Sequence, residues 1–317
     1  MNNVNKVVLG YLVLKQIRVE HANTISSPIT YGFPAVTGFL GAVHAMSRKL
    51  QQTNLSELSL GGVLIACHDC QPQIYQTTPY ADFTFNQTRN PIKKDGKTAS
   101  IIEEGKCHIT VSLVVEVLAT EDEDDDESLT EQQIQQLLTL AGQWVQQQRI
   151  AGGSVQGLAK FKPLTFLQPE DIDQIKPLIM PAFVLMDAHK DLLELTELQQ
   201  RIDPSATALD ALIDVSALHH VPEQDDKGIT QWQVRSAKTG RGWIVPIPVG
   251  YQAISDLYEP GVMQNARNPE YPSQYVEAIY SLGKWVFPHR IDNLKTAFWH
   301  YQHDTTNNLY LTIQNHS

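Results

Sequence analysis

The sequence predicts an α+β protein with a ferredoxin-like (RRM-like) domain, an inserted hairpin and an appended region of helices and strands. Three observations support this fold class. Residues 109–118 alternate apolar and polar side chains, as a strand with one buried face does. Residues 36–50 instead carry apolar side chains at helical spacing. Residues 1–168 read strand, helix, strand, strand, helix, strand, which is the ferredoxin-like order.

The chain is expected to have three parts. These are a ferredoxin-like domain at 1–168 with an inserted loop or hairpin at 69–106, a helical insertion at 169–228, and a β-rich region at 229–317 that packs on the first domain. The length of 317 residues, with 42% apolar and 19% charged residues, is typical of a globular protein with a real core. No run approaches the roughly 20 apolar residues of a membrane span. The N-terminus lacks a signal-peptide cleavage site, so we expect a cytoplasmic protein.

The first strand is expected over about 7–19. Its apolar residues keep one phase as far as Leu14 and the opposite phase from Ile17 onward. Side chains alternate strictly between the two faces of a strand, so this slip indicates a β-bulge.

A polar loop containing Asn23, Ser26 and Ser27 follows the first strand. Pro34 then favours a helix start, because its fixed φ is helical and its missing N–H is not needed in a first turn. Gly38 and Gly41 lie inside this helix at a cost of about 1 kcal/mol each relative to alanine. We therefore expect another segment to pack closely against them.

Two aromatic residues, Tyr31 and Phe33, lie just before this helix. Free N–H groups and the positive end of the dipole allow a helix N-terminus to hold an anion. A phosphate at the helix end and a base on an aromatic face would fit this arrangement. The alternative is a tight strand-to-helix connection whose aromatics belong to the core.

The second and third strands are expected at 63–66 and 109–118. The segment between them reads as a protruding hairpin or loop, with prolines and a basic turn. Its four basic residues either contact RNA or keep the tip soluble, and the sequence leaves both readings open: Arg89, Lys93, Lys94 and Lys97.

Seven consecutive acidic residues, 121–127, precede the second helix. We interpret them as a solvated loop, where negative charge beside a helix N-terminus is mildly favourable. Ser128 and Glu131 have the spacing of a capping box, and the helix should end near Arg149. Gly152 and Gly153 then form either a left-handed helix cap or a loop whose backbone can approach phosphates.

Beyond residue 168 the pattern is less regular. It predicts a strand at 182–186, helices at 190–202 and 207–218, strands at 229–235 and 243–249, a helix at 274–282 and a last strand at 309–313. The strands at 229–235 and 243–249 are expected to form a hairpin turned at the basic run 238–242.

The net charge of −11 argues against a broadly basic, nucleic-acid-binding surface. The run 121–127 supplies seven of these charges, whereas residues 227–300 contain eight Lys or Arg against five Asp or Glu. A protein that holds a short single-stranded end needs a local groove, stacking and backbone amides. We therefore expect weak affinity for free RNA, and RNA binding alongside partner subunits.

Two groups of residues could form a metal site or a catalytic site. Cys67, Cys70 and Cys107, with neighbouring histidines, have the ligand count of a zinc site. Cys67 and Cys107 lie in strands, where neighbours point to opposite faces, so we expect reduced thiols and no metal. His44 is either a packed or hydrogen-bonded structural histidine, which we favour, or the general base or acid of an RNA-cleaving enzyme. The sequence contains no P-loop, dinucleotide fingerprint or nucleophile elbow, and no cofactor is expected.

Four runs carry a family resemblance, in order along the chain: HANTISSPITYGFPAVTGFLGAVHAMSRKL at 21–50, RIAGG at 149–153, GWIVPIPVGY at 242–251, and YSLGKW with PHR at 280–290. These runs resemble the RAMP-superfamily subunit of the type I-F CRISPR surveillance complex, the Csy complex, that holds the 5′ handle of the guide RNA. The resemblance covers both ends of the chain and leaves the acidic run and about 170–228 without a recognised signature.

The resemblance implies a non-catalytic RNA-binding subunit, because precursor cutting in these systems belongs to a separate subunit. Its partners would be the CRISPR RNA, the large subunit and the repeated backbone subunits, with target DNA reached indirectly. The implied RNA-binding residues are Asn23, Ser26, Ser27, Tyr31, Phe33, Arg149, Gly152, Gly153, Arg235, Arg241, Arg267 and Arg290. The alternatives are a metal-independent endoribonuclease that uses His44 and a zinc-stabilised interaction domain.

Overall fold

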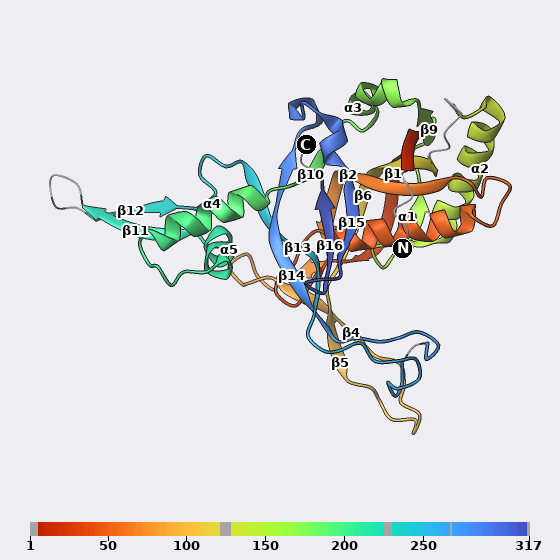
Figure 1. Cartoon of the computed structure of the whole chain (residues 1–317). Coiled ribbons are helices and arrows are strands. Elements are labelled where there is room, and N and C mark those ends of the chain that lie inside the picture. Colours follow the sequence, from red (N-terminus) through yellow and green to blue (C-terminus); the bar gives the residue numbers. More distant parts are fainter. Residues whose placement is uncertain (1–5, 121–127, 225–227, 229, 267, 316–317) are drawn as a thin grey trace. The chain divides into compact units, whose positions relative to one another are not determined.

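The computed structural model describes residues 6–120, 128–224, 228, 230–266 and 268–315 (Figure 1). The acidic run and Arg267, both singled out from the sequence, lie outside the described residues. The chain is a mixed α/β protein built mainly of antiparallel strands. It divides into two compact units, Met1–Phe183 and Val184–Ser317, and each is described by itself.

The sheet of the first unit is organised around one long strand, β1 (Lys6–Asn23). Strand β1 pairs with β6 along one edge and with β9 and β8 along the other, and β6 also pairs with β2. All of these pairs are antiparallel, so the strands lie in the order β2-β6-β1-β8-β7. The bounds are β2 Ser59–Pro72, β6 Lys106–Thr120, β7 Arg149–Ile150, β8 Gly153–Gly157 and β9 Leu164–Leu167.

The β-bulge expected in the first strand is confirmed. The register between β1 and β6 shifts between Leu14 and Ile17, and Gln16 within the bulge has a φ of 49°. The Gln16 N–H leaves the regular ladder and donates to Oγ of Ser112, 3.0 Å away. A bulge changes where side chains point, so both apolar phases reach the core while Lys15 remains half-exposed.

Helices α1 (Val36–Leu50) and α2 (Glu131–Gln147) belong to this unit. Helix α1 begins two residues after Pro34, and its predicted apolar stripe is buried. The capping box of α2 uses Thr130 and Gln133 instead of Ser128 and Glu131: Thr130 Oγ1 accepts from the Gln133 N–H, and Gln133 Oε1 accepts from the Thr130 N–H at 2.9 Å. Thr130 and Gln133 have the same capping-box spacing as Ser128 and Glu131, so the sequence contains two overlapping capping-box motifs.

The segment between β2 and β6 forms a separate three-stranded antiparallel sheet, with β3 Ile74–Tyr75, β4 Thr84–Arg89 and β5 Ile101–Glu104. Most of its side chains are exposed. The first unit ends with the short helices η1 (Pro169–Gln174) and α3 (Ile175–Leu178).

The second unit has an antiparallel sheet in the order β10-β14-β13-β16-β15. The bounds are β10 Phe183–Asp187, β13 Trp243–Ala253, β14 Val276–Val286, β15 Trp299–Asp304 and β16 Leu309–Gln314. Helices α4 (His189–Gln200) and α5 (Ala208–Ser216) lie close to the predicted ranges. Their leucines pack on Ile244 of β13 and Leu282 of β14. Two short helices, η2 (Pro288–Arg290) and η3 (Leu294–Ala297), precede β15.

Two sequence predictions for this unit are wrong. Residues 274–282 are not a helix, because most of them belong to β14, which pairs with β13 from Val276 to Trp285. The second error is the hairpin turned at 238–242. Strand β12 (Thr230–Arg235) pairs with β11 (His219–Gln224), whereas β13 pairs with β14 and β16. A short apolar run is compatible with both the helical and the strand periodicity, so residues 274–282 were ambiguous. The pairing partner of a strand depends on segments far away in the sequence, so the hairpin could not be read from the local turn.

Candidate nucleic-acid interface

The loop between β1 and α1 is closed by its own hydrogen bonds. Thr24 Oγ1 donates to the Gly32 carbonyl at 2.6 Å, and the Gly32 N–H donates to the Thr24 carbonyl at 2.9 Å. Inside this closure the hydroxyls of Ser26 and Ser27 contact Oγ1 of Thr30 at 2.8 and 2.6 Å. Ser27 is also buried, so both serine hydroxyls hold the loop in shape.

The two aromatic residues of the loop have different surroundings. Tyr31 is 47% exposed and its ring contacts Phe85 of β4 edge-on, with centroids 4.9 Å apart. Phe33 stacks on Phe39, a fully buried residue of α1, at 5.3 Å. Burial raises the pKa of Tyr31, and negative charge on the Cys107 and Cys70 sulfurs would add to this, so its hydroxyl stays protonated at neutral pH. Tyr31 therefore offers a ring to a ligand, whereas Phe33 supports the loop from the core side.

The glycine pair lies in a β-hairpin, not at the end of a helix. Strands β7 and β8 pair Ile150 with Gly153, and the two residues of the turn, Ala151 and Gly152, have φ values of 48° and 79°. Two positive φ angles are the signature of a tight type I′ hairpin turn. The reading of these glycines as a helix cap is therefore wrong, because α2 ends at Gln147 and the chain enters β7.

The turn contacts both β1 and α1. A Cβ added at Gly153 would lie 2.6 Å from the Glu20 carbonyl oxygen, so Gly153 is buried against β1 and offers no surface to RNA. A Cβ added at Gly38 would lie 2.9 Å from the Ala151 Cα. The predicted close approach to Gly38 is thus confirmed, and the approaching segment is this turn. The same prediction for Gly41 is wrong, because Gly41 is exposed on α1.

One exposed strip connects the turn with the loop. The Asn23 N–H donates to the Ala151 carbonyl at 2.8 Å, and Asn23 Nδ2 donates to the Ile25 carbonyl at 2.8 Å. Ile25 in turn pairs with Tyr31. We define the hairpin strip as Asn23, Ile25, Tyr31, Arg149 and Gly152, all of which are exposed. Arg149 makes no ion pair with any carboxylate of the described residues.

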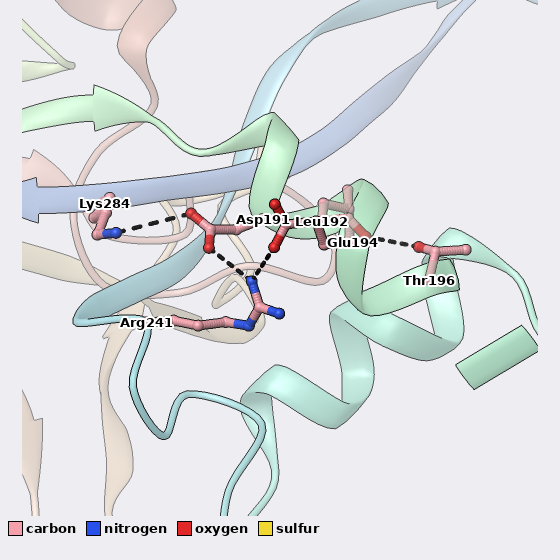
Figure 2. A network of polar contacts seen from close by, with 6 residues as sticks. All are labelled: Asp191, Leu192, Glu194, Thr196, Arg241 and Lys284. Carbon is pink, nitrogen blue, oxygen red and sulfur yellow. Dashed lines mark hydrogen bonds and ion pairs between the residues drawn. The ribbon is translucent and has the colours of Figure 1, made fainter. Parts of the chain in front are cut away.

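The arginines of the second unit that were predicted to bind RNA differ in their ion pairs and in their exposure. Arg241 lies between two carboxylates of α4: Nη1 donates to Asp191 Oδ1 at 3.0 Å and to Glu194 Oε2 at 2.8 Å, while Lys284 Nζ lies 3.9 Å from Asp191 Oδ2 (Figure 2). The same two carboxylates raise the pKa of Arg241. The side chain is only 19% exposed and attaches the loop before β13 to α4, so its RNA contact stays a prediction without support from these ion pairs.

Arg235 pairs with Glu223 across the β11–β12 hairpin, and its side chain remains largely exposed. Arg290 is exposed in η2 and forms no ion pair with a carboxylate of the described residues. Of the arginines predicted in this unit, Arg290 is therefore the one whose charge is open to a ligand within the described part of the chain.

His44 is exposed on α1, so the expectation of a packed histidine is wrong. The helix stripe turns toward Val43 and Ser47, which leaves His44 on the solvent side. Cys67, Cys70 and Cys107 are free thiols. No group of three or more possible metal ligands gathers among the described residues.

A basic pocket in the first unit escaped sequence reasoning. Lys15, Arg18, Lys160 and Phe161 line it, from β1 and the loop after β8. The available signal was the triplet Lys160-Phe161-Lys162, an aromatic residue between two cations. Its importance was hidden because Lys15 and Arg18 are far away in sequence and reach the triplet only through strand pairing.

No helix in the described part of the chain is long and apolar enough to cross a membrane. The fold and the hairpin strip define a mixed α/β protein of antiparallel sheets, with a type I′ turn packed against the first helix. A family model described as CRISPR-associated protein (Cas_Csy2) matches residues 12–312. CRISPR-associated protein Csy2 of Pseudomonas aeruginosa (strain UCBPP-PA14) is 34% identical, covering 94% of this chain and 93% of that protein. The chain therefore belongs to the CRISPR-associated Csy2 family, which confirms the resemblance stated from the sequence.

Proposed function

We propose that this protein is a non-catalytic CRISPR RNA-binding subunit that caps the 5′ handle of the guide RNA in the type I-F surveillance complex. In that complex it would contact the large subunit and the repeated backbone subunits, help recruit the large subunit for interference with target DNA, and act in the cytoplasm. Membership of the Csy2 family supports this proposal.

A ferredoxin-like, RAMP-type domain would carry the RNA site. The order β2-β6-β1-β8, with α1 after β1 and α2 after β6, supports this assignment, since it follows the strand-helix-strand-strand-helix-strand pattern. In this arrangement the β7–β8 hairpin follows the second helix directly, at the position where the family resemblance implies a glycine-containing RNA contact.

The hairpin strip is the observation on which the proposal depends. Gly152 leaves the turn open, because a Cβ there would meet nothing closer than the Asn23 Cβ at 3.7 Å. Arg149 supplies an exposed charge that forms no ion pair with a carboxylate of the described residues, and Tyr31 supplies an exposed ring for a base. Proteins that hold single-stranded RNA combine these elements: cationic and backbone contacts to phosphates, and aromatic faces for unstacked bases.

The proposal assigns different tasks to the residues implied by the resemblance. Asn23, Tyr31, Arg149 and Gly152 contact RNA directly. Ser26, Ser27 and Phe33 act through the shape of the loop, because their polar or aromatic groups contact other loop and helix residues. Arg235 and Arg290 remain candidates for RNA or subunit contacts in the second unit.

The test is co-purification from cells that also express the suspected partner subunits and a repeat-spacer RNA, with the ends of the bound RNA sequenced. We expect a guide with an intact 5′ handle, retained with the wild type and reduced about tenfold with the pair Tyr31→Ala and Arg149→Ala. Arg201→Ala is the matched control, since Arg201 is an exposed arginine at the end of α4. Equal handle retention by all three proteins would refute the assignment of the strip.

A further inference from the structure

The basic pocket of the first unit has a volume of about 420 Å³. It lies where the bulge of β1 meets the loop 158–163, which connects β8 with β9. Two backbone hydrogen bonds fix the loop to the bulge: the Lys15 N–H donates to the Pro163 carbonyl at 2.8 Å, and the Ala159 N–H donates to the Lys15 carbonyl at 3.0 Å. These two bonds hold the loop against the β1 bulge, and the pocket lies between them.

Four cations gather at this pocket. Lys15, Arg18 and Lys160 line it, and Lys162 is close enough that it adds to the effect of burial in lowering the pKa of Lys15. None of the four forms an ion pair with a carboxylate of the described residues. Arg241, by contrast, has two carboxylate partners. An anionic ligand would relieve the mutual repulsion of the four cations.

An aromatic ring is exposed beside these cations. Phe161 is 86% exposed, between Lys160 and Lys162, so the core does not account for its ring. A surface of lysine and arginine with an exposed aromatic side chain is the arrangement by which proteins bind single strands, with phosphates on the cations and a base on the ring. A purely phosphate-binding site would not require the ring.

Local backbone geometry supports a built site. Gln16 and Lys162, from the two facing segments, have φ values of 49° and 41° although neither is glycine. Such conformations cost on the order of 1 kcal/mol each and concentrate at binding sites. Gly157 also matters, because an added Cβ would lie 2.7 Å from Arg18 Nη2, so its missing side chain leaves room for the guanidinium.

We propose that this pocket binds a segment of single-stranded nucleic acid, with phosphates on Lys15, Arg18 and Lys160 and one base stacked on Phe161. The site is separate from the hairpin strip, since β8 places the length of a five-residue strand, roughly 15 Å, between the turn and the pocket. A guide RNA and a DNA strand offer the same phosphate and base chemistry.

The experiment uses the full chain and two fluorescent probes of about 12 nucleotides, oligouridylate and oligodeoxythymidylate, each carrying a photoreactive thio-base. Crosslinked peptides are identified by mass spectrometry, and affinity is followed by anisotropy over a salt series. We expect crosslinks at 158–162, and an about tenfold loss of affinity for Phe161→Ala that Phe161→Tyr restores. Lys160→Ala, which removes one of the three proposed phosphate contacts, should lower the salt slope by about 0.7. Lys190→Ala, on exposed α4, is the control.

The two probes distinguish the sources: preference for oligouridylate assigns the site to the guide, and equal or stronger binding of oligodeoxythymidylate assigns it to a DNA strand. The same crosslinking on the complex purified with its guide separates this inference from the proposed function. Loss of handle retention with crosslinks at 158–162 would refute the capping role alone. Absence of these crosslinks in both preparations, or an unchanged affinity of Phe161→Ala, would refute the pocket as a nucleic-acid site.

Discussion

Replacing Gly38 with alanine should destabilise the first unit, although alanine is the better helix former. The helix itself would gain about 1 kcal/mol from the substitution. The new Cβ, however, would lie 2.9 Å from the Ala151 Cα, and this neighbour is backbone that cannot rotate away. Overpacking of this kind costs about 1–3 kcal/mol. The net expectation is a loss of about 1 kcal/mol in the free energy of unfolding, or about 2–4 °C in Tm.

The assay is thermal and denaturant unfolding of the full chain, with Gly41→Ala as the control. Gly41 is exposed on the same helix, so its replacement should raise the stability through helix propensity alone. Adding Ala151→Gly removes the Ala151 Cβ, which would lie 3.1 Å from the new Cβ, and leaves the Cα in place, so the two positions should show a coupling of at least about 0.5 kcal/mol while part of the destabilisation remains. A Gly38→Ala variant that is stabilised as much as Gly41→Ala would refute the close approach of the hairpin to α1.

Three further predictions follow from individual contacts. Arg241→Ala should lower stability by about 1–3 kcal/mol, because it leaves the partly buried Asp191 carboxylate beside Glu194 with Lys284 alone; an unchanged unfolding midpoint would contradict this network. Thr130→Ala should lower the free energy of unfolding by about 1 kcal/mol, and Ser128→Ala should lower it much less. A larger loss for Ser128→Ala in denaturant titrations would place the capping box at Ser128. Burial, with a smaller contribution from Asp69, raises the pKa of Cys67 to about 12, so Cys67 should react with iodoacetamide at pH 8 roughly a thousandfold more slowly than free cysteine. Labelling of Cys67 at the free-cysteine rate, measured by mass spectrometry, would show that the thiol is not buried.

Features that depend on one segment were predictable from the sequence. The apolar stripe of α1 and the phase slip of β1 are both local, and both are present in the structure. The close contact of a neighbour at Gly38 could be expected from the cost of a glycine inside a helix, although the same reasoning fails for Gly41, which is exposed. The sequence did not reveal that this neighbour is Ala151, because no local pattern records which distant turn reaches a helix.

Features that depend on which distant strand or side chain a segment contacts were not predictable. Residues 274–282 contain apolar residues compatible with a helix. In the fold most of them form β14, because β13 offers backbone hydrogen-bond partners to this segment. Likewise Arg241 lies in a basic turn, and only the fold places it against two α4 carboxylates. The basic pocket shows the same limit, since two of its cations come from β1 and the others from 160–162.

The β11–β12 hairpin forms a two-stranded sheet of its own, and nearly all its described side chains are exposed, including Trp232. Two strands alone are marginally stable in water, so the amide protons of this ribbon should exchange with solvent far faster than those of β13 and β14. Any subunit that covers the ribbon would slow this exchange. The ribbon thus provides a built-in reporter of assembly, readable amide by amide without a label or a mutation.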